Sequence, residues 1–249
     1  MTDLDKLAQQ LDAPVTLRVS TRARRPGFSV SKRGLEVILP RRYAKKHVPQ
    51  LVRDNQQWIE SALKRAREQY GRFVGKEPPA LPRDLDLPCL KEQFSVDYRF
   101  DDIEKPILTE RPNRLSIRYT ENNIGGVFDC LREFVRKRAR DHFTQRMEVL
   151  STSTGLCYTK IAVRGQRTRW GSYSSKGIVS LNYKLMFLPY PLVEHVMLHE
   201  LCHSRHLNHS KRFWNLLQSV DENTDAHTEQ LRRGDDWIPD WVEFQNSRN

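Results

Sequence analysis

The chain reads YPLVEHVMLHELCHSRHLNHSKRFWNLL from Tyr190 to Leu217, and within this stretch the segment from His199 to His203 has the pattern H-E-x-x-H. Five of the eight histidines of the protein lie between residues 195 and 209. A random chain of this length and composition would contain about 0.015 such patterns, so chance is a poor explanation. The pattern predicts a metal site, provided that a helix carries it.

The residues before the pattern favour such a helix, because apolar side chains recur at helical spacing and Pro191 is acceptable in a first turn. The apolar positions are Leu192, Val193, Val196, Met197 and Leu201. On a helix His199 and His203 share one face, about 6 Å apart along the axis, so both imidazoles can reach one ion. Glu200 flanks that ion, where a carboxylate can take a proton from a water whose pKa zinc lowers to about 7. We therefore predict zinc ligands at His199 and His203 and a general base at Glu200.

A catalytic zinc ion needs a third protein ligand, and His206 and His209 are the nearest candidates. In a continuous helix His206 would lie about 10.5 Å along the axis from His199, too far for both to bind one ion. His209 becomes available if the chain turns back first, and Asn208 suits such a turn because asparagine tolerates the left-handed conformation. Ser210 can then cap a new helix. We favour His209 as the third ligand.

The sequence leaves other assignments open. An acidic residue on the next helix, Glu222 or Glu229, is the alternative to His209. His195 and His206 stay outside the predicted metal set, because a histidine near a metal site is more often a supporting or surface residue than a ligand. Cys202, between the two ligands of the helix, is most simply a small packed side chain.

A second motif, RWGSYSSKG, runs from Arg169 to Gly177 and is followed by Leu181-Asn182. Together with the histidine-rich stretch, and in the expected order, it resembles the YgjP-like zinc metallopeptidases, which are related to the WLM and SprT-like groups. The similarity covers most of the chain. It extends more weakly to the front segment, with Arg22, Arg24 and Arg25.

The resemblance implies a zincin-like catalytic half, with zinc held by His199, His203 and His209 and with Glu200 as the general base. The sequence departs from the family at Tyr173, where cysteine is common, so no role of that thiol carries over. The substrate does not carry over either, because a nucleotide-hydrolysing activity has also been attached to the group.

Three residues near the second motif are predicted to bind substrate: Arg169, Trp170 and Asn182. In this interpretation a strand beside the active-site helix accepts an extended peptide, and polar groups shape the cleft. The alternative is that the three residues serve hairpin packing and backbone hydrogen bonding.

The predicted fold class is α+β: a zincin-like catalytic half, with its active-site helix on a small antiparallel or mixed sheet, follows a smaller β-rich N-terminal region. We expect an N-terminal β/α region over residues 1–120 and a metal-dependent hydrolase domain over 121–249. Residues 75–112 contain six prolines and are assigned only in part. The expected strands are 15–19, 28–31, 35–39, 94–100, 115–119, 160–163, 169–173 and 178–182, and the expected helices include 43–70 and 127–150.

The composition indicates a polar, basic chain: 42 lysines and arginines against 31 acidic residues give a net charge of +11, and the mean hydropathy is −0.70. No apolar stretch reaches the 18 to 20 residues or so of a membrane helix, and the four widely spaced cysteines suggest neither a disulfide framework nor a cysteine metal site. We expect a cytoplasmic protein without a membrane partner. The oligomeric state is not predicted.

The leading functional hypothesis is a zinc-dependent metallopeptidase acting on a peptide or protein. One alternative keeps the zinc but hydrolyses a nucleotide phosphoanhydride, as a nucleoside triphosphate pyrophosphatase does. Another is a DNA-associated, SprT-like protease or nucleic-acid-binding module, because the basic surface makes nucleic acid a candidate partner. The basic helix face from Arg132 to Arg140 and the cluster from Arg18 to Arg25 are more simply solvated surface.

Overall fold

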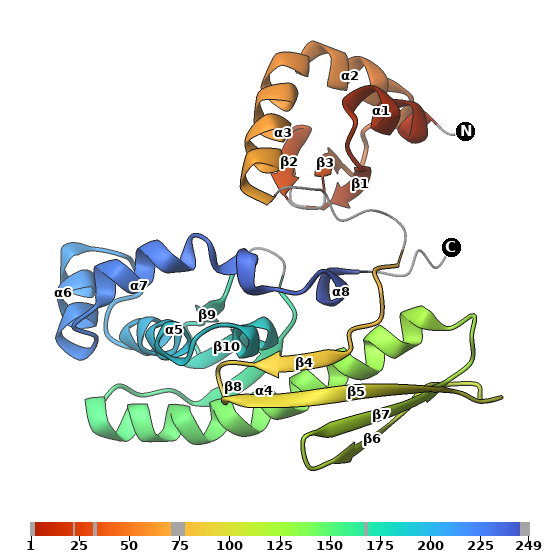
Figure 1. Ribbon diagram of the computed structural model, residues 1–249. Coiled ribbons are helices and arrows are strands. Elements are labelled where there is room, and N and C mark those ends of the chain that lie inside the picture. Colours follow the sequence, from red (N-terminus) through yellow and green to blue (C-terminus); the bar gives the residue numbers. More distant parts are fainter. Residues whose placement is uncertain (1–2, 22, 32–33, 71–77, 167–168, 245–249) are drawn as a thin grey trace. The chain divides into compact units, whose positions relative to one another are not determined.

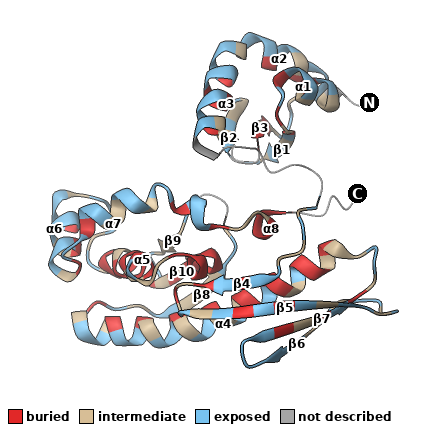
Figure 2. Ribbon diagram, viewed as in Figure 1, coloured by how far each residue is buried: buried red, intermediate tan, exposed pale blue. Residues whose placement is uncertain are grey.

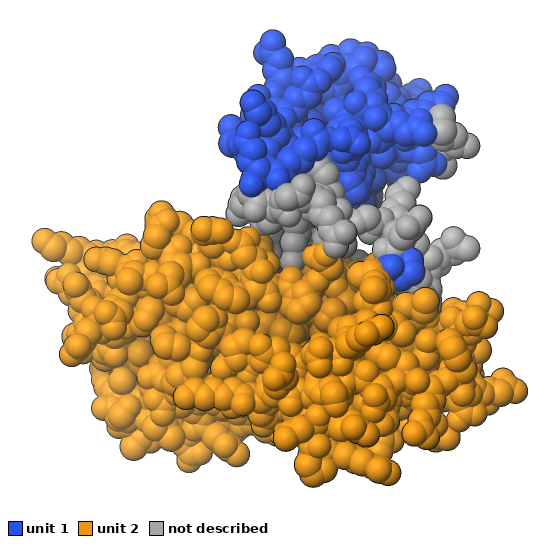
Figure 3. Space-filling view, in the orientation of Figure 1, with its two compact units in different colours: residues 1–78 blue, residues 79–249 orange. Residues whose placement is uncertain are grey.

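The computed structural model describes residues 3–21, 23–31, 34–70, 78–166 and 169–244 (Figure 1). The chain divides into two compact units, Met1–Pro78 and Pro79–Asn249 (Figure 3). Within the described residues no helix is both long and apolar enough to cross a bilayer.

The N-terminal unit combines a three-stranded sheet with helices. Its elements are α1 (Asp3–Leu11), β1 (Val15–Ser20), β2 (Gly27–Ser31), β3 (Gly34–Pro40), η1 (Lys45–His47), α2 (Val48–Asp54) and α3 (Gln56–Tyr70). The strand order is β1-β3-β2, with β1 parallel and β2 antiparallel to β3. Alternate residues of β3, such as Leu35 and Val37, are buried in one core with Ile59 of α3.

This unit confirms the three strands predicted between residues 15 and 39. The single helix expected over 43–70 is wrong, because the chain breaks at Asn55 and forms η1, α2 and α3 instead. Of the three front-segment arginines, Arg22 lies outside the described residues.

The second unit begins with a four-stranded sheet in the order β4-β5-β7-β6. Its strands are β4 (Asp84–Leu87), β5 (Glu92–Phe100), β6 (Ile107–Arg111) and β7 (Arg114–Tyr119). The expected strands at 94–100 and 115–119 are confirmed, and the proline-rich segment contributes two more. Prolines such as Pro88 and Pro106 lie between strands, where the missing N–H costs no ladder hydrogen bond.

This sheet packs on the long helix α4 (Ile124–Thr154), where the rings of Phe94 and Phe134 meet edge to face with their centroids 5.3 Å apart. The compact units therefore divide between Pro78 and Pro79, not after the predicted residue 120, because residues 84–119 share a core with α4 and the catalytic half. The helix begins at an Asn123 cap, whose side chain accepts a hydrogen bond from the Gly126 N–H at 3.0 Å.

The basic face of α4 is solvated only in part: Lys137 and Arg140 are exposed as expected, whereas Arg132 makes internal contacts. Arg132 is buried and donates hydrogen bonds to the backbone oxygens of Trp241 and Phe244. Arg146 pairs with Glu194 at 2.8 Å. These contacts hold the backbone at residues 241–244 and the helix that carries Glu194 against α4.

The catalytic half of this unit contains a second small sheet, in the order β8-β10-β9, followed by a run of helices. The elements are β8 (Lys160–Arg164), β9 (Gly171–Tyr173), β10 (Ile178–Asn182), η2 (Tyr183–Phe187), α5 (Tyr190–Cys202), α6 (Lys211–Val220), α7 (Thr224–Leu231), η3 (Gly234–Trp237) and α8 (Asp240–Glu243). In this mixed sheet β10 is parallel to β8 and antiparallel to β9.

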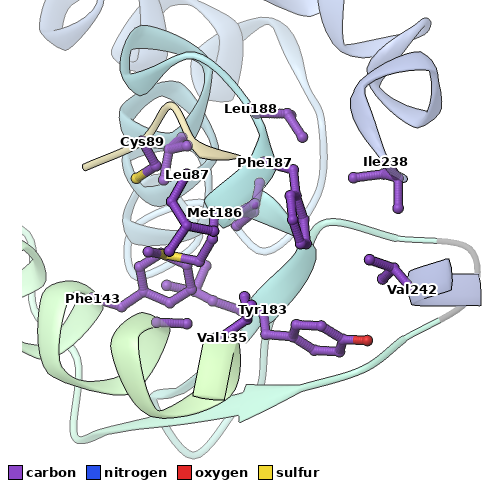
Figure 4. Close-up of a cluster of buried hydrophobic side chains, with 14 of the residues drawn as sticks. Leu87, Cys89, Val135, Phe143, Tyr183, Met186, Phe187, Leu188, Ile238 and Val242 are labelled. Atoms are coloured by element: carbon purple, nitrogen blue, oxygen red, sulfur yellow. The ribbon is translucent and has the colours of Figure 1, made fainter. Parts of the chain in front are cut away.

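Helix α5 lies in the middle of this half and is mostly buried (Figure 2). The core below it joins side chains from distant parts of the chain, including Leu87 of β4, Phe143 of α4 and Met186 of η2 (Figure 4). The α+β class is confirmed, with the active-site helix beside a small mixed sheet and a β-rich region before it.

Candidate metal centre

Helix α5 carries the H-E-x-x-H pattern in its last turn, as predicted. His199 and Glu200 belong to the helix, and His203 is the residue that ends it. Apolar side chains surround the helix because it is buried on several sides, so its position is fixed by packing and not by an amphipathic surface stripe alone. A rigid helix therefore carries the two imidazoles and the carboxyl group.

The chain turns back directly after His203. Backbone N–H groups of Arg205 and His206 both donate to the carbonyl of Cys202, which closes the turn. His206 contributes its carbonyl oxygen, which accepts a hydrogen bond from Nδ1 of His203 at 2.9 Å. That bond fixes the His203 tautomer and leaves Nε2 free for a metal ion.

Two details of the predicted turn need correction. Asn208 is not left-handed: the described non-glycine residues with positive φ are Asp12, Lys91 and Asn113. The reversal comes instead from successive hydrogen-bonded turns over residues 200–206. Ser210 does stand at the N-cap of α6, but its side chain makes no capping hydrogen bond.

The turn brings His209 back to the helix. Its Nε2 atom lies 3.0 Å from Nε2 of His199, and candidate ligand atoms of His199, His203 and His209 all lie within 4.8 Å of one another. In a tetrahedral site with zinc–nitrogen bonds of 2.0 to 2.1 Å, ligand nitrogens are about 3.3 Å apart, so the spacing suits one ion. The alternatives Glu222 and Glu229 are exposed, and neither belongs to this group among the described residues.

Phe213 of α6 packs against all three imidazoles, with ring centroids 4.7 to 4.8 Å away, and is fully buried. Burial lowers the pKa of His199 to about 3, with His203 and His209 adding to the shift, and burial also lowers the pKa of His203. Both imidazoles are therefore neutral at physiological pH, which is the form that binds a metal ion.

Glu200 follows His199 on α5, and its side chain is buried. Burial raises its pKa to about 7, against the opposing effect of Arg169. Its Oε2 atom has no hydrogen-bond partner among the described residues. Strand β9 lies against the Glu200 side chain so closely that a Cβ on Gly171 would stand 2.6 Å from Oε1, so any larger residue there would displace the carboxyl group.

The three residues predicted to bind substrate surround one cavity next to β9. Asn182 is buried, and its side-chain amide bonds to the backbone. Its Nδ2 donates to the carbonyl oxygens of Gln166 and Arg169, and its Oδ1 accepts from the Lys184 N–H. Asn182 thus shapes the cavity wall, whereas Arg169 is exposed. Trp170 packs on η3, where a Cβ at Gly234 would lie 2.5 Å from its ring.

Tyr173, at the position where the family commonly has cysteine, directs its hydroxyl to the Cys157 carbonyl oxygen at 3.3 Å. It lies in β9, two residues after Gly171. In this chain the position therefore fastens the strand to the loop before β8.

A second cluster was not predicted from the sequence. Asp221, after α6, accepts hydrogen bonds at Oδ2 from Nδ1 of His195 at 2.5 Å and from Nδ1 of His227 at 2.9 Å. We call His195, Asp221 and His227 the histidine bridge. These spacings are those of hydrogen bonds and are short for two ligands of one metal ion. His195 lies one helical turn before His199, which is the only signal of the bridge in the sequence.

The bridge fixes the far end of α6. Burial alone would raise the pKa of Asp221. The hydrogen bonds from His227 and His195 have the opposite and larger effect, so the pKa lies below its ordinary value. Helix α6 is therefore held to α5 at two places, by Asp221 at its end and by Phe213 near its beginning. Its beginning follows His209 directly, so the bridge helps to hold the third imidazole in place.

Comparisons with known proteins place the chain in a family. The model of the YgjP-like family, described as a metallopeptidase domain, matches residues 24–234. A crystal structure of the metallopeptidase zymogen of Pyrococcus abyssi abylysin is similar at 19% identity over 34% of this chain and 87% of that one, with a TM-score of 0.32. That structural likeness is too weak to support an argument. A comparison of the chain with curated proteins found no match. Because the family match spans most of its length, the chain belongs to the YgjP-like metallopeptidase family.

Proposed function

We propose that the protein is a zinc-dependent metallopeptidase in which His199, His203 and His209 hold the ion and Glu200 is the general base. The observation that carries the proposal is the convergence of three imidazoles at the end of a helix that also carries Glu200, a buried carboxyl group with an oxygen that has no partner among the described residues. Family membership supports a metal-dependent hydrolase. Three nitrogen ligands leave a fourth position for water or substrate, as catalytic zinc sites require.

When bound, zinc would polarise the scissile carbonyl and lower the pKa of a water molecule. Glu200 then accepts a proton from that water at Oε2 while the water oxygen bonds to the carbonyl carbon. It gives the proton to the leaving nitrogen as the C–N bond breaks. A carboxyl group whose pKa stands near 7 in the metal-free protein suits both steps, because it exchanges protons readily near neutral pH.

The substrate we propose is an extended peptide or protein segment. Strand β9 is the last strand in the order β8-β10-β9, so one of its edges has no strand partner among the described residues. Gly171 on this strand lies against Glu200. A peptide added to this edge would place its backbone next to the general base, with main-chain hydrogen bonds holding it there.

The first experiment measures metal and turnover together. The purified protein should contain about one zinc ion per chain. Glu200→Gln should keep the zinc and lose at least about a hundredfold of peptidase turnover, because it removes the proton carrier but no ligand. The proposal fails if the wild-type protein cleaves no unfolded protein substrate, or if Glu200→Gln cleaves it at the parental rate. Nucleoside triphosphates belong in the same assay, since their hydrolysis would favour the phosphoanhydride alternative.

A second role, binding of nucleic acid by the N-terminal unit, is favoured by the charge distribution. Residues 1–78 contain 17 lysines and arginines against 8 acidic residues, a net charge of +9, whereas residues 79–249 contain 25 against 23, a net charge of +2. Most of the net charge therefore belongs to the unit that does not contain the three clustered histidines. DNA affinity should fall steeply with salt, and absence of binding at low salt would contradict this role.

A further inference from the structure

A cavity of about 160 Å³ lies beside the start of β9. Its lining includes Gln166, Arg169, Trp170, Lys184, Arg232 and Asp235. Two of these residues connect it to the metal centre. Trp170 immediately precedes Gly171, which touches the Glu200 carboxyl group, and the Arg169 guanidinium is near enough to act on that group electrostatically.

The cations of this cavity are not equivalent. Lys184 is buried and forms an ion pair with Glu243, so its charge is balanced inside the protein. Arg232 pairs with Glu229, but both side chains are about 70% exposed, and exposed pairs of this kind contribute little. No ion pair joins Arg169 to any described residue. Two guanidinium groups are thus available to an anion.

The cavity also has a hydrogen-bond acceptor without a donor. The Oε1 atom of Gln166 is buried and has no partner among the described residues. Buried polar atoms are nearly always satisfied, so a ligand that supplies an N–H group would complete it. A carboxylate for the guanidinium groups and an N–H for Gln166 occur together in a peptide. At roughly 30 Å³ per water, the volume equals about five waters, enough for one acidic side chain or a chain end.

We propose that this cavity is a substrate subsite that binds a carboxylate of the peptide through Arg169 and Arg232. The proposal rests on the peptidase function and adds a specificity to it: cleavage close to an acidic side chain or to a free C-terminus. Planar guanidinium groups suit this ligand because they donate two parallel hydrogen bonds to a carboxylate.

Binding is tested first, without any need for turnover. In the zinc-loaded full-length protein labelled with 5-fluorotryptophan, the Trp170 ¹⁹F resonance is identified by its loss in Trp170→Phe. Acetyl-Glu-amide, which has a side-chain carboxylate, or acetyl-Gly-Gly, which has a C-terminal carboxylate, should shift this resonance. The probe that shifts it shows which of the two carboxylates the cavity binds. Acetyl-Gln-amide and acetyl-Gly-Gly-amide should not shift it.

The arginines are tested with a matched pair of neighbours. Arg232→Gln should weaken carboxylate binding about tenfold, since it removes a charged hydrogen-bond donor. Arg233→Gln should leave binding unchanged, because Arg233 pairs with Asp236 and does not line the cavity. In peptide cleavage, Arg232→Glu should reverse a preference for glutamate into one for lysine.

The outcomes separate this proposal from the peptidase function. The subsite is wrong if the amide probes shift the Trp170 resonance as strongly as the carboxylate probes do. It is also wrong if Arg232→Gln and Arg233→Gln bind the carboxylate probes equally well. Peptide cleavage without any acidic preference also overturns the subsite and leaves the peptidase standing. Carboxylate binding in a protein that cleaves no peptide supports the site but overturns the peptidase.

Discussion

Each of the two histidine clusters includes a residue of α5, His195 or His199, and these two residues are one helical turn apart. The clusters differ in what completes them. In the histidine bridge, an ionised carboxylate stands between two imidazoles and satisfies both by hydrogen bonds. In the metal centre, two imidazole nitrogens face each other at 3.0 Å with no anion between them among the described residues. The first cluster is complete without a ligand, whereas the second is arranged for a cation.

The carboxyl groups show the same contrast. Hydrogen bonds from two imidazoles hold the pKa of Asp221 below its ordinary value, while burial raises the pKa of Glu200 to about 7. A carboxylate that accepts hydrogen bonds from its neighbours is fixed in its charged form and serves structure. A buried carboxyl group without such donors changes its protonation near neutral pH, which is what proton transfer requires.

The largest expected effect comes from removing the imidazole that closes the metal centre. His209→Ala should weaken zinc binding more than about a hundredfold, which exceeds the loss usual for residues that only support a ligand. His206→Ala is the matched control, because that residue contributes its backbone carbonyl and keeps it. Zinc affinity measured against a competing chelator checks both variants, and an equal loss in His206→Ala would contradict the assignment.

The next effect concerns the space around Glu200. Gly171→Ala should retain zinc but lose about a hundredfold of turnover, because the added Cβ would stand 2.6 Å from Oε1 and displace the carboxyl group. Ser172→Ala on the same strand serves as the control. Steady-state cleavage and zinc content are measured together. Unchanged turnover in Gly171→Ala would show that the position of the carboxyl group is not critical.

The clustering of His199, His203 and His209 was predictable from the sequence, because helical spacing places the first two on one face and because His206 would lie too far along a continued helix. The chain reversal was predicted, but its mechanism at Asn208 was wrong, since backbone hydrogen bonds within residues 200–206 already complete it. Asp221 and His227 could not be found this way. Their partner His195 lies 26 residues before Asp221, and no local spacing rule connects them.

The strands show the same limit. Alternation of apolar residues revealed the N-terminal strands and β10, but not β4 or β6 in the proline-rich segment. The roles of α4 arginines also depend on distant partners: Arg132 meets the backbone of Trp241 and Phe244, more than a hundred residues later. A basic helix face therefore looks like solvated surface until tertiary contacts are known.

The histidine bridge should act on the metal centre indirectly. Asp221→Ala leaves two imidazole N–H groups without an acceptor and should lower the free energy of unfolding by roughly 3 kcal/mol. Zinc affinity should fall about tenfold, since α6 then holds His209 less firmly. Glu222→Ala, at the adjacent exposed residue, is the control and also tests the alternative ligand. If Asp221→Ala loses stability while its zinc affinity stays the same, the bridge serves the fold alone.

The smallest expected effect is a dependence of stability on pH. The pKa of Asp221 is lower in the folded protein, so its ionised form stabilises the fold fully above the unfolded value of about 3.9. That contribution is lost as the pH falls through the lower, folded value. The difference in free energy of unfolding between the wild type and Asp221→Asn should therefore shrink as the pH falls below the unfolded pKa of the carboxyl group. Chemical denaturation at each pH measures it, and a difference that does not shrink in that acid range would mean that the folded protein does not hold Asp221 ionised.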